Sequence, residues 1–232
     1  MIITIDGPAG AGKSTVARGL ARRLGFQFLD TGAMYRAVAL AGLRKNIDWN
    51  RPDDLARLAP TLRIELLDDR VLLDGEDVSQ SIRTQETTSV TRYSAANPAI
   101  RGHLVELQRK MAAKDDFVTE GRDQGTVAFP NAAFKFFVTA SPKERARRRL
   151  LDLQSQGESA TLEKVLEDQT QRDRQDSSRE VGPLAKADDA IEILTDGITI
   201  GEVVERIAKI VENGEIKRGR SNFNVLDSSE YP

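Results

Sequence analysis

Short apolar runs alternate along this chain with segments whose apolar residues recur at helical spacing. Five runs have the length of strands but lack strict alternation, which is typical of parallel strands buried on both faces. They are Ile2–Asp6, Phe26–Asp30, Phe117–Glu120, Phe134–Thr139 and Ile191–Thr195. The helical segments are Ser14–Leu24, Ala33–Leu43, Pro98–Ala113, Pro142–Leu153, Leu162–Arg179 and Ile200–Val211. The pattern predicts an α/β fold with a doubly wound parallel sheet.

One segment interrupts this alternation. Leu62–Leu67 and Arg70–Gly75 resemble two strands joined by a tight polar turn. Such a pattern predicts a small antiparallel hairpin, inserted between Pro60 and about Gln85.

Several helix ends and connections can also be predicted. Gly25 is expected to end the first helix, and Ser141 to cap the helix that starts at Pro142. The polar stretch Gln154–Ala160 suggests a mobile connection. The polar end of the chain, Gly214–Pro232, is expected to pack weakly or to be disordered.

Composition narrows the class of protein. The chain has 232 residues, a net charge of -2 and no cysteine, which excludes disulfides, zinc thiolates and thiol catalysis. No apolar run approaches the ~20 residues that cross a bilayer, and Asp6 follows Met1 too closely for a signal peptide. We therefore expect a cytoplasmic protein with no membrane partner. The small negative charge argues against a nucleic-acid partner, and without a heptad seam we expect a monomer.

The strongest chemical signal lies between the first strand and the first helix. Gly7-Pro8-Ala9-Gly10-Ala11-Gly12-Lys13-Ser14-Thr15 has the spacing of a phosphate-binding loop, a P-loop. Small residues let backbone N–H groups surround a polyphosphate, and the following helix adds its positive end. Lys13 would contact the β- and γ-phosphates of ATP, and Ser14 would ligate Mg²⁺. The alternative, a glycine-rich turn with an accidental lysine, does not explain the flanking strand and helix.

The loop alone does not identify the reaction. The Asn-Lys-x-Asp pattern of a GTPase is absent from the sequence, and the chain is short for a motor protein. A small P-loop protein of this length is more often a kinase of a small metabolite. A kinase for another acceptor and a non-catalytic nucleotide-binding module remain the rival hypotheses.

Two further motifs follow predicted strands, where open α/β sheets bind their ligands. In the first, 30–36, Thr31 and Gly32 can cap the next helix and Arg36 can bind an anion. In the second, 120–126, Arg122 and Asp123 place a cation and a carboxylate beside the P-loop. The alternatives are a plain helix cap with a solvated arginine, and a surface turn with a weak salt bridge.

Two basic helical segments flank the predicted mobile connection. They contain Arg145, Arg148, Arg172 and Arg179. Arginines that close over a transferring phosphoryl group would lower the barrier, and a mobile flap would exclude water. The alternative is a solvated helical face.

At these residues the chain resembles the bacterial cytidylate kinases, a family of nucleoside monophosphate kinases. The resemblance runs from Ile2 to about Val211 and is carried by five segments: 5–15, 30–36, 82–86 (Ile-Arg-Thr-Gln-Glu), 121–127 and Pro183-Leu184. It implies a P-loop three-layer fold with a five-stranded parallel core, a small antiparallel insertion and a helical lid. The resemblance also implies that the chain is one kinase unit with three parts. These are a core at 1–59 and 96–213, a nucleotide-binding insertion at about 60–95 and, within the core span, a lid at about 150–180. A polar tail, 214–232, follows.

The same resemblance implies transfer of a phosphoryl group from ATP to CMP or dCMP, with Mg²⁺, in pyrimidine metabolism. Lys13, Arg122, Arg172 and Arg179 would be catalytic, with Arg145 and Arg148 in the lid. The acceptor phosphate would be held by Thr31, Arg36 and Arg122, and the ribose by Arg172 and Asp176. The cytosine edge would meet Arg101 and Asp123, with Arg179 close by.

One position departs from the family pattern. A serine that contacts the base is frequent nine residues before Arg101, and Arg92 stands there in this chain. Ser94 lies close by, so either Arg92 or Ser94 is the candidate replacement. Thr31 stands where a serine is frequent, but it keeps the hydroxyl group.

Overall fold

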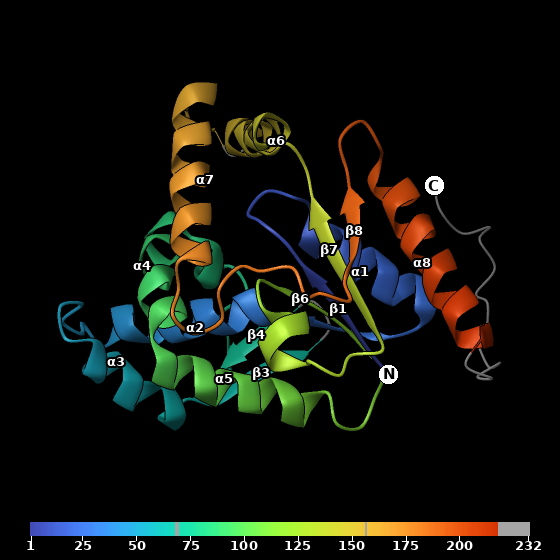
Figure 1. Ribbon diagram of the computed structural model, residues 1–232. Helices are drawn as coiled ribbons and strands as arrows, with labels where there is room; N and C mark the ends of the chain where they lie inside the picture. The colour runs from blue at the N-terminus through green and yellow to red at the C-terminus, as the bar shows by residue number, and fades with distance from the viewer. Residues whose placement is uncertain (68–69, 156, 218–232) are drawn as a thin grey trace. The chain divides into compact units, whose positions relative to one another are not determined.

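The computed structural model describes residues 1–67, 70–155 and 157–217 (Figure 1). The chain divides into two compact units. Among the described residues, the first comprises 1–28, 115–179 and 183–217, and the second comprises 29–114 with 180–182.

Apart from Leu29 and Asp30, which belong to the second unit, the five-stranded parallel sheet that the apolar runs predict lies in the first unit. Its strand order is β2-β6-β1-β7-β8. The strands are β1 (Ile2–Asp6), β2 (Gln27–Asp30), β6 (Phe117–Gly121), β7 (Phe134–Thr139) and β8 (Ile191–Leu194). Each differs by at most one residue at either end from the predicted run. Because β1 pairs with both β6 and β7, the loop after β1 starts in the middle of the sheet.

Two helices of this unit pack together against the sheet. They are α1 (Lys13–Leu24) and α8 (Ile200–Lys217), which lie side by side in Figure 1. Their apolar faces bury Leu20 and Ile207 against Ile3 and Phe136. Gly25 ends α1 with a φ of 69°, which confirms the predicted C-cap.

The end of α8 differs from the prediction. The helix was expected to stop near Val211, yet it continues through Gly214 to Lys217. Gly214 lies against the ring of Phe134, since an added Cβ would be 2.5 Å from it. A glycine there allows the helix to stay close to the sheet. The rest of the predicted tail, 218–232, lies outside the described residues.

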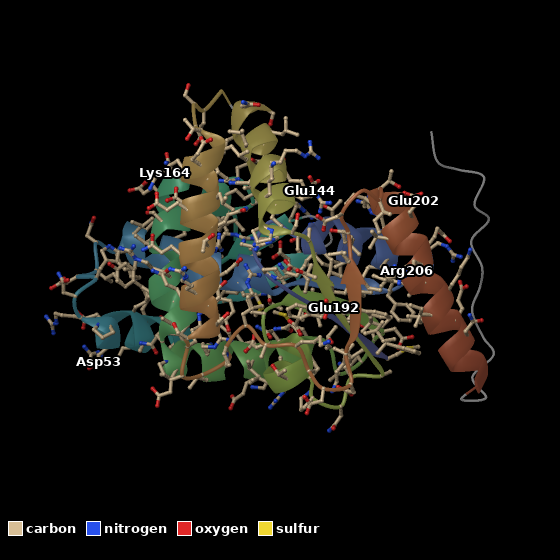
Figure 2. The ribbon with its side chains drawn as sticks, turned by 45° about the horizontal axis from the view of Figure 1, so that its top comes forward. Asp53, Glu144, Lys164, Glu192, Glu202 and Arg206 are labelled. Carbon is tan, nitrogen blue, oxygen red and sulfur yellow. The ribbon has the colours of Figure 1, made fainter. Side chains whose placement is uncertain are left out.

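A second helix pair belongs to the same unit. Helices α6 (Pro142–Ser155) and α7 (Leu162–Ser177) enclose a small apolar cluster that includes Ala146, Leu153 and Val165. Figure 2 labels Glu144 on the first of these helices and Lys164 on the second. The hydroxyl of Ser141 accepts a hydrogen bond from Glu144 N at 3.3 Å, as expected for an N-cap.

The second unit has its own core and a small antiparallel sheet. The sheet consists of β3 (Ile64–Leu67), β4 (Arg70–Leu73) and the short β5 (Glu76–Asp77). The predicted hairpin is therefore confirmed, although its turn, 68–69, lies outside the described residues. Around the sheet lie α2 (Thr31–Arg44), α3 (Pro52–Leu58), α4 (Gln85–Ala96) and α5 (Pro98–Met111). Apolar residues of α2 and α5, with those of the hairpin, form the core.

Within the described ranges, no helix is both long and apolar enough to cross a bilayer.

Candidate functional site

The loop between β1 and α1 has the backbone of an anion-binding nest. Gly7, Gly10 and Gly12 have φ values of 148°, 76° and 83°, which side chains rarely allow. At Gly7 an added Cβ would lie 2.0 Å from the carbonyl oxygen of Val138. The first turn of α1 contains no acidic residue, so the positive end of that helix is not neutralised locally. These features fit a loop that accepts a polyphosphate.

Lys13 lies inside this loop. Its side chain is 5% exposed and its Nζ donates a hydrogen bond to Pro8 O at 2.8 Å. The pKa of Lys13 is lowered to about 7, chiefly by burial and also by repulsion from Arg122 and Arg172, against the attraction of Glu120. The amine therefore lacks enough negative charge nearby to keep its ordinary pKa, and a polyanion would supply that charge.

The hydroxyl of Ser14 lies next to a carboxylate from β6. Ser14 Oγ donates to Glu120 Oε1 at 2.8 Å, and Glu120 is 6% exposed. Hard oxygen ligands of this kind suit Mg²⁺, which takes few protein ligands and completes its shell with phosphate oxygens and water. Accordingly, the described part of the chain holds no group of three or more His, Cys, Asp or Glu side chains that could cage a metal. Ser14 fits its predicted role, and Glu120 is a candidate ligand that the sequence analysis did not single out.

Asp6 connects the P-loop to the turn after β6. Its carboxylate accepts hydrogen bonds from Gln124 N at 2.9 Å and from Gly125 N at 2.7 Å. Burial raises the pKa of Asp6 to about 6, although the two amides lower it. From the sequence, Asp6 was placed at the end of a strand and used as a sign against a signal peptide, with no role in the site. A carboxylate directly before the first glycine of the loop was the available signal.

A cluster of arginines surrounds Asp176 on α7. Arg122 Nε lies 2.8 Å from Asp176 Oδ2, and Arg179 forms an ion pair with Asp176 Oδ1. Burial raises the pKa of Asp176, but Arg122, Arg179 and Arg172 together outweigh it, and the pKa lies below its ordinary value. Asp176 is thus ionised and holds guanidinium groups beside the P-loop lysine, which Arg122 and Arg172 repel. The neighbouring Asp123 is 3% exposed.

The two predicted lid arginines, Arg145 and Arg148, are bound to protein groups in this structure. Arg145 is 7% exposed and its Nη1 donates to Ala9 O at 2.8 Å and to Asp173 Oδ2 at 2.5 Å. Arg148 donates to Thr195 O at 2.8 Å and to Glu144 Oε1 at 2.9 Å. Neither side chain belongs to a solvated helical face.

The predicted acceptor residues of the second unit lie on α2 and α5. Asp30, and not Thr31, caps α2, because its Oδ1 accepts from Ala33 N at 2.8 Å. The capping prediction for Thr31 was therefore wrong, because the helix already begins at Thr31 and the carboxylate one residue earlier reaches the free amide. Arg36 Nη2 lies 3.4 Å from Asp30 Oδ1, and Arg101 Nη1 donates to Ala95 O at 2.9 Å.

The two candidates for the missing base-contacting serine lie in different environments. Ser94 is fully buried, and its hydroxyl lies 2.9 Å from Tyr35 O and 2.8 Å from Thr91 O. Arg92 is exposed, with its guanidinium 4.9 Å from the centre of the Tyr93 ring. The single proton of Ser94 is thus directed to the backbone of its own unit.

The predicted site residues fall into two sets. The first unit brings together Lys13, Ser14, Arg122, Asp123, Arg172, Asp176 and Arg179, and the second contains Thr31, Arg36, Ser94 and Arg101. In chemical terms, the first set can bind and stabilise a reacting polyphosphate.

Comparison with known proteins agrees with this chemistry. A family model described as Cytidylate kinase matches residues 3–213. The cytidylate kinase of Rhodopirellula baltica is 50% identical over 211 residues, which cover 91% of this chain and 92% of the relative. The cytidylate kinase of Geobacter sp. (strain M21) is 49% identical over 216 residues, with 91% and 93% covered.

One solved structure shares the fold. It is an uncharacterized protein from Eubacterium ventriosum, with a TM-score of 0.51 and 16% identity, and 92% of this chain and 98% of that chain are covered. The family model and the two kinases, each matched over nine-tenths of this chain, show more than a fold. The chain belongs to the cytidylate kinase family of phosphotransferases, which implies phosphorylation of a nucleotide with ATP.

Proposed function

We propose that the protein transfers the γ-phosphoryl group of ATP to CMP and dCMP. Apart from the family, one observation supports this most. Lys13 is buried at the P-loop, and both Arg122 and Arg172 lie near enough to lower its pKa. Bringing three cationic side chains together costs free energy because they repel one another. A polyanion bound among them would offset that repulsion.

The transfer is direct and in line. A phosphate oxygen of CMP attacks the γ-phosphorus, a new P–O bond forms, and the bond to the β-phosphate oxygen breaks, so that ADP leaves with the electron pair. The attacking oxygen is already anionic and needs no general base. The product is CDP or dCDP, and no covalent enzyme intermediate forms.

The residues of the first unit stabilise the charge that the reaction spreads over the phosphoryl oxygens. The amides of 7–15 and the Lys13 amine hold the β- and γ-phosphates, while Arg122, Arg172 and Arg179 contact the transferring group. Mg²⁺, with Ser14 among its ligands, neutralises β- and γ-phosphate oxygens when it is bound. Helices α6 and α7 serve as the lid.

The acceptor contacts follow those that the family resemblance implies. Thr31, Arg36 and Arg122 bind its phosphate, Arg172 and Asp176 its ribose, and Arg101, Asp123 and Arg179 its base. Ser94 is the proposed replacement for the base-contacting serine: its hydroxyl proton is directed to backbone carbonyls, but its oxygen can still accept from the amino group of cytosine.

An acceptor panel tests the proposal. Initial rates with ATP and Mg²⁺ would be measured for CMP, dCMP, UMP, AMP, GMP and the matched nucleoside cytidine, which lacks the acceptor phosphate. We expect kcat/KM for CMP and dCMP to exceed that for UMP by at least about ten-fold, and cytidine to be inert. Preference for cytidine or another alcohol would refute the assignment of Arg36 and Arg122 to a phosphate. ATP binding without any acceptor-dependent ADP release would indicate a binding module.

A further inference from the structure

Asp173 on α7 bonds directly to the P-loop. Its Oδ1 accepts a hydrogen bond from Ala9 N at 3.1 Å, and its Oδ2 lies 2.5 Å from Arg145 Nη1. The same Nη1 donates to Ala9 O at 2.8 Å. Asp173 and Arg145 together therefore bind both the N–H and the C=O of one loop residue. We call this arrangement the Asp173–Arg145 clip.

The clip is well shielded from water and supported on both sides. The side chains of Arg145 and Asp173 are 8% and 17% exposed, and Arg145 Nε also donates to Ala140 O at 3.2 Å. One turn earlier on α7, the side-chain nitrogen Nε2 of Gln169 lies 2.6 Å from the position that a Cβ on Gly10 would take. Helix α7 thus approaches the P-loop at two successive turns. A buried ion pair of this kind leaves an uncompensated charge when one partner is removed.

The clip also determines how other residues of α7 face the loop. Arg172 directly precedes Asp173, and Asp176, which binds Arg122, follows one turn later. A helix held at Asp173 cannot rotate or slide without moving both of these side chains, because successive residues of a helix are rigidly spaced. The bond between Asp173 and Ala9 therefore also determines where Arg172 and Asp176 lie relative to the P-loop.

We propose that Asp173 is a positioning residue, which holds α7 on the P-loop so that Arg172 meets the transferring phosphoryl group. The proposal rests on the kinase function proposed above. The opposite role is also chemically reasonable: Asp173 could be a stand-in for phosphate that ATP must displace from the Ala9 amide. The two roles predict different results for Asp173→Asn: an almost unchanged affinity for ATP if Asp173 positions the helix, and tighter binding if it competes with phosphate.

The test compares Asp173→Asn with a matched control on the same helix, Asp168→Asn. Asp168 is exposed and its carboxylate pairs with Lys164 of the same helix at 2.9 Å, so it carries the same charge as Asp173 without taking part in the clip. For each full-length variant, kcat and KM for CMP are measured, with Kd for ATP·Mg by calorimetry and the Tm. Asp173→Asn is expected to lower kcat at least about ten-fold, with Kd for ATP·Mg changed less than about three-fold. Asp168→Asn is expected to match wild type in all of these.

Two further variants keep the test decisive. Asp173→Glu retains the charge and is expected to be more active than Asp173→Asn. In the double variant Arg145→Met/Asp173→Asn, the loss in kcat is expected to be much smaller than the product of the single losses, since both changes break the same clip.

Each contrary outcome has a distinct meaning. An unchanged kcat with a lower Tm would show that the clip only stabilises the fold, and tighter binding of ATP by Asp173→Asn would show that Asp173 competes with phosphate. A glutamate variant no more active than the asparagine variant would also contradict the positioning role. Each of these outcomes would overturn the positioning role of Asp173. The proposed kinase function would stand as long as the wild-type protein phosphorylates CMP. A wild type inactive on CMP would instead defeat the function itself.

Discussion

At the scale of single residues, the P-loop contains two buried ionisable groups whose pKa values are shifted toward their neutral forms. Lys13 is buried with its pKa lowered to about 7, while Asp6, also buried, has its pKa raised to about 6. Both groups are less charged than they would be in water, because desolvation exceeds the attraction they receive. The site therefore gains from a bound anion that restores the charge of the lysine.

We expect Lys13→Met to lower kcat by a factor of about 10² to 10³ while the protein stays folded. The lost amine removes a charge that acts on the phosphates in the transition state, an effect of about 3–4 kcal/mol for comparable groups. Steady-state kinetics checks this, with circular dichroism to verify folding. Near-normal turnover in a folded Lys13→Met protein would contradict the role of the lysine.

Proton uptake gives a second test of the same residue. With a pKa of about 7, the free Lys13 amine is mostly neutral at pH 8, and bound ATP is expected to recharge it by raising that pKa. ATP binding then takes up a proton above pH 7, and the affinity for ATP falls as the pH rises through that range. Calorimetry with ATP·Mg at pH 8, in buffers of different ionisation enthalpy, measures the uptake. The Lys13→Met variant is the control, and an equal uptake in both proteins would rule out Lys13 as the source.

At the scale of elements, the site depends on how the P-loop is placed between β1 and α1. Gly7 turns the chain with a φ of 148° against the backbone of β7, where no side chain fits. Asp6, one residue before it, binds two amides of the turn after β6. The loop is thus fastened to both strands that flank β1.

We expect Gly7→Ala to lower the free energy of unfolding by about 1–3 kcal/mol, because the new Cβ would meet the carbonyl oxygen of Val138 and an unfavourable φ. Chemical denaturation followed by circular dichroism measures the change. The matched control is Gly201→Ala in α8, where an added Cβ has no neighbour within 4 Å. A helical alanine there should be neutral or stabilise by up to about 1 kcal/mol. Equal effects of the two substitutions would argue against the steric explanation.

At the scale of the whole molecule, the predicted donor and acceptor residues are divided between two compact units. The P-loop belongs to the first unit, and Arg36, with its partner Asp30, to the second. Since each unit has its own core, a substitution in one need not disturb the local geometry of the other.

We expect Arg36→Met to raise KM for CMP by about 10- to 100-fold, the equivalent of one charge-assisted hydrogen bond of about 1.5–3 kcal/mol. The Kd for ATP·Mg should change less than about two-fold, because the P-loop keeps all of its own contacts. Kinetics with CMP as variable substrate and calorimetry with ATP·Mg separate the two effects. The control is Arg44→Met, at the end of the same helix α2, which breaks the exposed pair of Arg44 with Glu76 of β5. A parallel loss of ATP affinity in Arg36→Met would contradict the division of roles.

Much of the fold could be predicted because its signals are local. All five sheet strands and the six helices with an apolar stripe were predicted. The helices α3 and α4 were not, for a physical reason. Only Leu55 is buried on α3, and α4 buries Thr87 and Ser94, so neither has an apolar period. The two-residue β5 is defined only by its pairing with β4.

By itself, the sequence determined the P-loop, its flanking strand and helix, and the residue types that bind phosphate. Each of these depends on contiguous residues, whose φ preferences, capping and periodicity act over a few positions. Tertiary structure alone decided which distant groups meet: Asp6 with the amide of Gln124, and the Asp173–Arg145 clip with Ala9. Partners separated by 118 and 164 positions are brought together by strand order and helix packing, and no local preference encodes that choice.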